Sequence, residues 1–134
     1  MKTFAALLVI LAAQGAVAAS PIATKHHSSG TMAPKYRVAE EIEVFANGEV
    51  KITTNNKGKE TIAKKALAKD ELTKLTACIA KLKKAKEVKR SNCMGGATTS
   101  YFAGEKLVQT TGCGATAKSS ESCVSSFARA LDKF

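Results

Sequence analysis

Two hydrophobic periods alternate along the chain, and their order restricts the fold more than any other feature. Apolar side chains occupy every second position around the dipeptide Asn47-Gly48, and they then recur at helical spacing over residues 70–86. The same two periods follow again over residues 97–111 and over the last fifteen residues. The predicted order is hairpin, helix, hairpin, helix. The simplest arrangement is an α+β fold in which a small antiparallel sheet of two hairpins carries both helices packed on one face.

The first hairpin can be assigned a register. Ile42 and Val44 precede the turn, and Val50 and Ile52 follow it. A two-residue Asn-Gly turn would place these pairs on opposite faces of the hairpin. A three-residue loop over residues 46–48, with Gly48 in the left-handed conformation, pairs Val44 with Val50 and Ile42 with Ile52. We therefore predict the three-residue loop, followed by a turn at 55–59 and a short strand at 61–63.

The remaining elements follow from the same reasoning. The first helix has one apolar stripe, with acidic residues in its first turn, where the helix dipole favours them. The second hairpin turns at Gly104-Glu105 and places Phe102 opposite Leu107, with a kink or bulge at Gly95-Gly96. We expect Ser119 or Ser120 to cap the last helix. The two predicted stripes comprise Leu72, Leu75, Ile79 and Leu82 in the first helix, and Val124, Phe127, Ala128 and Leu131 in the second.

The first nineteen residues have the pattern of a secretory signal peptide. Lys2 precedes an apolar run over residues 4–13, and small residues at 16–19 fit a cleavage site. The run is shorter than the roughly 20 residues needed to cross a bilayer. We expect a secreted, extracellular protein without a transmembrane segment. Residues 20–35 carry little apolar content and are predicted to be a flexible leader, and residues 36–134 a single α+β domain.

The four cysteines, at 78, 93, 113 and 123, are predicted to form two disulfides. An even number of cysteines in an oxidising compartment favours disulfides, and none of the spacings is that of a zinc or redox pair. Three connectivities are compatible with the sequence. We favour Cys93 with Cys113, which flank the second hairpin, and Cys78 with Cys123, which lie at the edges of the two helical stripes. Sequential pairing, Cys78 with Cys93 and Cys113 with Cys123, is nearly as well supported.

The sequence contains no pattern typical of a catalytic or cofactor site. Both histidines, His26 and His27, fall in the predicted leader, where they lack the further ligands that hold zinc. Nucleophilic catalysis needs an imidazole held against the nucleophile. Glu41 and Glu43 are expected on the outward face of their strand. We therefore predict a non-enzymatic protein with no cofactor and no metal, and a small secreted enzyme is the least favoured alternative.

The positive charge is concentrated in one part of the chain. The net charge is +10, and residues 57–90 carry twelve basic and four acidic side chains. The densest tract has one acidic residue, Glu87, among six basic ones: Lys81, Lys83, Lys84, Lys86, Lys89 and Arg90. Such density attracts polyanions. The tract is therefore a candidate for binding an acidic polysaccharide or an anionic extracellular surface, although a Lys-rich helix face is more often simply solvated.

The protein is expected to be a monomer, and nucleic acid and protein are the two other classes of partner. Nucleic acid is disfavoured because lysine outnumbers arginine in the tract and no aromatic residue lies within it. The competing class is a protein-binding module, such as a protease inhibitor or an effector, that uses the hairpin tips at 46–48 and 104–105. A rigid loop loses little entropy on binding, but neither tip carries a distinctive anchor residue.

Overall fold

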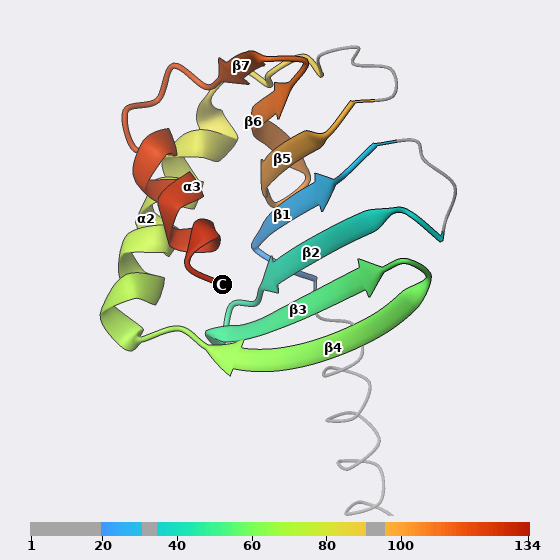
Figure 1. Cartoon of the computed structure of the whole chain (residues 1–134). Helices are drawn as coiled ribbons and strands as arrows, with labels where there is room; N and C mark the ends of the chain where they lie inside the picture. The colour runs from blue at the N-terminus through green and yellow to red at the C-terminus, as the bar shows by residue number, and fades with distance from the viewer. Residues whose placement is uncertain (1–19, 31–34, 91–95) are drawn as a thin grey trace, which may run out of the picture.

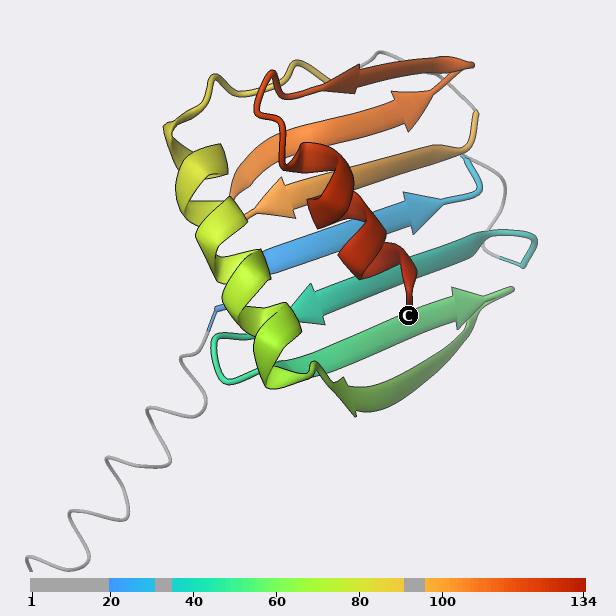
Figure 2. The same ribbon diagram turned by 90° about the vertical axis from the view of Figure 1, so that its left-hand side faces the viewer.

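The structure, a computed structural model, describes residues 20–30, 35–90 and 96–134. These residues form a seven-stranded antiparallel sheet in the order β4-β3-β2-β1-β5-β6-β7. Helices α2 (Lys69–Lys84) and α3 (Val124–Asp132) both pack on one face of the sheet, as Figures 1 and 2 show. The strands are β1 (Ala23–Ser28), β2 (Val38–Val44), β3 (Glu49–Asn56), β4 (Lys59–Ala66), β5 (Thr98–Ala103), β6 (Lys106–Gly112) and β7 (Ala115–Lys118). The prediction of a small sheet of two hairpins is therefore wrong, because β1, β4 and β7 extend it.

Strand β1 corrects part of the prediction of a flexible leader over residues 20–35, of which residues 31–34 lie outside the described residues. It lies in the middle of the sheet, where it pairs with β2 on one side and with β5 on the other. Ala23 is fully buried, but the next two positions on the same face are Lys25 and His27. The Lys25 ammonium lies 3.0 Å from Asp132 of α3, and His27 Nδ1 is hydrogen-bonded to Thr99 Oγ1 at 2.8 Å. Polar residues thus occupy positions that apolar residues usually fill, so the sequence lacks the alternating apolar pattern that predicts a strand.

The hairpin of β2 and β3 confirms the predicted register. Val44 pairs with Val50 and Ile42 with Ile52, and Gly48 has a φ of +89°. The Gly48 carbonyl accepts a hydrogen bond from the backbone N–H of Leu67 at 2.8 Å. The strand predicted at 61–63 is longer than expected and forms the exposed edge strand β4.

The second hairpin also forms, and Phe102 pairs with Leu107 as predicted. The irregularity lies between Tyr101 and Phe102, so that Val108 on β6 is left without a partner across from it. The bulge predicted at Gly95-Gly96 cannot be compared, since residue 95 is outside the described residues. Tyr101 and Ala103 belong to the buried core under the helices. Phe102, which alternates with them along β5, therefore faces the opposite side of the sheet.

The two helices bury the predicted stripes, except that Leu72, at the start of the α2 stripe, is only half-buried. Helix α2 buries Leu75, Ile79 and Leu82, and α3 buries Val124, Phe127, Ala128 and Leu131. The predicted serine cap of α3 is wrong. Ser119 is tied to the sheet by a 2.8 Å bond from its N–H to the Val108 carbonyl, and the helix begins only after Cys123. The Ser119 hydroxyl instead accepts a hydrogen bond from the backbone N–H of Glu121 at 3.2 Å.

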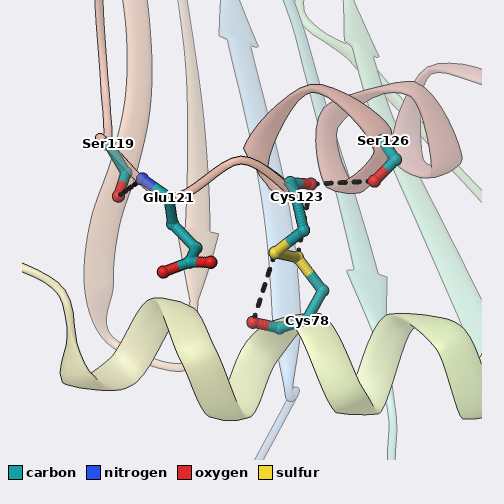
Figure 3. The surroundings of a disulfide bond; sticks show 5 residues. All are labelled: Cys78, Ser119, Glu121, Cys123 and Ser126. Carbon is teal, nitrogen blue, oxygen red and sulfur yellow. Dashed lines mark hydrogen bonds between the residues drawn. A yellow bond between two sulfur atoms is a disulfide. The ribbon is translucent and has the colours of Figure 1, made fainter.

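A disulfide between Cys78 and Cys123 joins the middle of α2 to the start of α3 (Figure 3). This is one of the two bonds that we favoured, and it excludes the sequential connectivity. Cys113 is disulfide-bonded as well. Cys93, its expected partner, lies outside the described residues. The disulfide and the shared apolar core therefore hold both helices against each other and against the sheet.

Candidate functional site

The six basic residues of the predicted tract, here called the basic strip, are all exposed. Lys81, Lys83 and Lys84 occupy the last turn of α2, and the other three follow in the connection beyond Ala85. Cations in the last turn complement the negative end of the helix dipole, so the first three also have a structural role. Figure 2 shows the connection leaving the end of α2 and passing along the β7 edge of the sheet.

The end of α2 is anchored to the second hairpin by a residue that the sequence analysis did not single out. The Lys106 ammonium, at the start of β6, donates hydrogen bonds to the carbonyl oxygens of Lys83 and Ala85. The Lys83 side chain also packs against Gly104 in the β5–β6 turn. A Cβ atom added to this glycine would lie only 3.2 Å from Lys83 Cε. These contacts fix the position at which the strip leaves the helix.

The second half of the strip crosses to the face of the sheet away from the helices. The backbone N–H of Val88 donates to the Leu107 carbonyl at 3.1 Å, and the Arg90 guanidinium lies 5.8 Å from the centre of the Phe102 ring. Because Phe102 faces away from the helices, Arg90 lies on that side as well. The basic strip therefore bends around the β5–β6 hairpin from one face of the sheet to the other.

A hollow of about 500 Å³ lies beside this second half of the strip. Its apolar surface comes from Val88, Phe102 and Leu107, and two cations of the strip line it. Glu87 and Glu105 also line it, so its charges are mixed. Phe102 and Leu107 were not predicted as site residues, because only the contact of β6 with the connection brings them next to the strip.

The two histidines face opposite sides of the sheet. His26 lies 4.0 Å from Glu41 on the face away from the helices, while His27 bonds Thr99 on the helix face. Adjacent residues of one strand cannot direct both rings to the same ion. Within residues 20–30, 35–90 and 96–134, no three metal-ligating side chains converge. Glu41 lies opposite Thr53 on the face away from Ile42, as predicted.

The hairpin tips differ in how much surface they offer. At the first tip Ala46 and Asn47 are exposed, but Gly48 is buried beneath the connection between β4 and α2. At the second tip Glu105 is exposed and lines the hollow. Neither tip presents a large apolar or aromatic side chain that could anchor a protein partner.

A polar cluster on the helix face ties α3 to the sheet. The Tyr101 hydroxyl donates to Asp132 Oδ1 at 2.6 Å, and Lys25 Nζ lies 3.0 Å from the same oxygen. Burial of the phenol, its hydrogen bond to Asp132 and the negative charge of that carboxylate all raise the pKa of Tyr101 well above its usual value of 10. A phenol held in its protonated form is a hydrogen-bond donor and not a base, so this cluster is structural.

No protein-family model matches the chain, and comparison with curated proteins and with solved structures finds no match. Among the described residues, no helix has the length and apolar character that a membrane crossing requires.

Proposed function

We propose that this chain is a secreted, non-enzymatic binding protein that holds an acidic extracellular polysaccharide along the basic strip. The observation that carries the proposal is the combination of six exposed cations with a backbone that is anchored at several points. Anchoring lowers the entropy that the strip loses when it binds an extended polyanion. Secretion is part of the proposal and is supported by the pattern of residues 1–19.

A polysaccharide fits the strip better than a nucleic acid does. Binding to single-stranded nucleic acid typically relies on aromatic rings on which bases can stack. The Phe102 ring lies beside the strip, and Arg90 lies over its face. Five of the six cations are lysines, which recognise charge rather than the planar edge of a base.

The test compares two variants that lose the same charge in different places. In the strip variant Lys84, Lys86 and Lys89 are changed to Gln. In the control variant Lys59, Lys65 and Lys69 are changed to Gln; these exposed residues lie on β4 and at the start of α2, near the opposite edge of the sheet. Each exposed ionic contact contributes roughly 0.2–1 kcal/mol, so three contacts correspond to about tenfold in affinity.

Both variants and the parent protein are eluted from immobilised heparin with a salt gradient, after circular dichroism confirms that they are folded. We expect the strip variant to elute at clearly lower salt than the control variant. Affinity of the parent should fall steeply with ionic strength, because exposed charges are screened. Equal shifts of the two variants would mean that net charge alone retains the protein, and the proposed site would be wrong.

A further inference from the structure

A second hollow lies between the two helices, away from the basic strip. It has a volume of about 310 Å³, and its apolar lining comes from Leu75, Cys78, Phe127 and Ala130. The disulfide of Cys78 with Cys123 joins the helices at this place (Figure 3). The hollow, here called the interhelical groove, is therefore held open by covalent and core contacts that do not depend on a ligand.

The rim of the interhelical groove is positively charged. Lys74 of α2 and Arg129 of α3 line it from opposite helices, and both are exposed. Lys133 and Glu71 also line it, and these two are paired with each other, with Lys133 Nζ 3.0 Å from Glu71 Oε1. Lys74 and Arg129 have no ion-pair partner among the residues that the structure describes. Two uncompensated cations thus stand over an apolar floor.

We infer that the interhelical groove binds a small amphipathic carboxylate, with the hydrocarbon on the apolar floor and the carboxylate between Lys74 and Arg129. Arginine can bind a carboxylate through two parallel hydrogen bonds, and lysine adds a second charge. The volume is close to the lower limit of about 300 Å³ for small-molecule sites, which favours a short aliphatic chain or a single ring over a long acyl chain. This site is independent of the proposed polysaccharide binding.

The inference is tested with sodium octanoate as the probe. The oxidised protein, labelled with ¹⁵N, is titrated and its amide chemical shifts are followed. We expect saturable shifts confined to α2 and α3, with a dissociation constant on the order of 1 mM for so small a ligand. Octan-1-ol has the same chain without the charge, and it should bind about tenfold more weakly if the cations contribute.

Three variants separate the contributions of charge and floor. Arg129→Gln should weaken octanoate binding about tenfold, because a charge-assisted contact is lost. Lys65→Gln, on β4, removes an equal charge elsewhere and should leave binding unchanged. Ala130→Leu fills the half-buried floor while keeping both cations, and it should abolish the saturable shifts. The spectrum of each free variant shows whether it is folded.

Several results would overturn the inference. These are octanoate shifts outside the two helices, equal affinity for octanoate and octan-1-ol, or full binding by either Arg129→Gln or Ala130→Leu. Binding of a short peptide with acidic and leucine residues in the groove, without any binding of octanoate, would also overturn it in favour of a protein partner. Retention of Arg129→Gln on heparin should equal that of Lys65→Gln, which distinguishes this site from the basic strip.

Discussion

Asp132 accepts a hydrogen bond from Tyr101 of β5 and forms an ion pair with Lys25 of β1. One carboxylate therefore connects the last helix to two neighbouring strands. Tyr101 is 6% exposed, whereas Tyr36, the other tyrosine of the chain, is 57% exposed. The two phenols therefore differ in burial. This difference makes Tyr36 a natural control for the energetic role of Tyr101.

We predict that Tyr101 makes the folded protein sensitive to alkaline pH. Its pKa in the fold lies above that of the unfolded chain, which is about 10. The stabilisation from the protonated phenol is thus complete below pH ~10 and is lost as the pH rises further. Tyr101→Phe should lower the free energy of unfolding by roughly 1–3 kcal/mol at neutral pH, because a hydrogen bond to a charged group is removed.

The measurement is urea unfolding at neutral pH and at pH ~11 for the parent, Tyr101→Phe and Tyr36→Phe. The gap in stability between the parent and Tyr101→Phe should narrow at the higher pH. Tyr36→Phe should follow the parent at both values. An unchanged gap at high pH would contradict the assignment of the alkaline effect to Tyr101.

At the scale of the elements, the Cys78–Cys123 disulfide restricts how α2 and α3 can separate. The two cysteines are 45 residues apart in the sequence, and the loop-entropy model gives about 4 kcal/mol for a closed loop of that length. A typical domain has a free energy of unfolding of only about 5–15 kcal/mol. The bond is therefore expected to supply a large share of the stability.

We predict that Cys78→Ala, Cys123→Ala and the double variant are destabilised by similar amounts, roughly 2–4 kcal/mol each. Either single change removes the whole bond, so the effects should not add. Urea unfolding of the three variants measures this directly. If the double variant lost the sum of the two single effects, the cysteines would act through separate packing contacts and not through the cross-link.

The sequence predicted an element correctly where the apolar residues of that element follow a regular local spacing and form its buried face. The register of β2 with β3 followed from Gly48 and four apolar residues, and the buried faces of α2 and α3 followed from helical spacing. It failed for β1, whose inward Lys25 and His27 find their partners only in α3 and β5. It failed also for β7, which is largely exposed and has no apolar period.

The candidate site was predictable in charge but not in shape. The six cations of the basic strip are adjacent in the sequence, so their density could be counted. The anchoring by Lys106 and the contact of Arg90 with Phe102 depend on how the second hairpin meets the end of α2. The interhelical groove likewise combines Lys74 with Arg129 from two helices, and no local pattern links them.

At the scale of the whole molecule, β1 connects the two halves of the sheet. In the order β4-β3-β2-β1-β5-β6-β7, β1 is the strand that both β2 and β5 pair with. Without β1 the sheet would be divided between β2 and β5. Each half would then expose the backbone of an unpaired inner strand, and Asp132 would lose its contact with Lys25. We therefore expect that removing β1 as part of a propeptide would abolish the fold.

We predict that a chain beginning at residue 35 does not fold, whereas a chain beginning at Ser20 does. Residues 23–28 pair along their full length with both neighbouring strands, and Ala23 is fully buried in the core. Urea unfolding followed by circular dichroism should give a cooperative transition for the longer chain and none for the shorter one. Adding residues 20–34 back as a separate peptide would partly restore the transition if the two halves remain competent to pair with β1. A cooperative transition of equal steepness in the shorter chain would show that β1 is not needed for folding. The segment would then be a leader, as the sequence predicted.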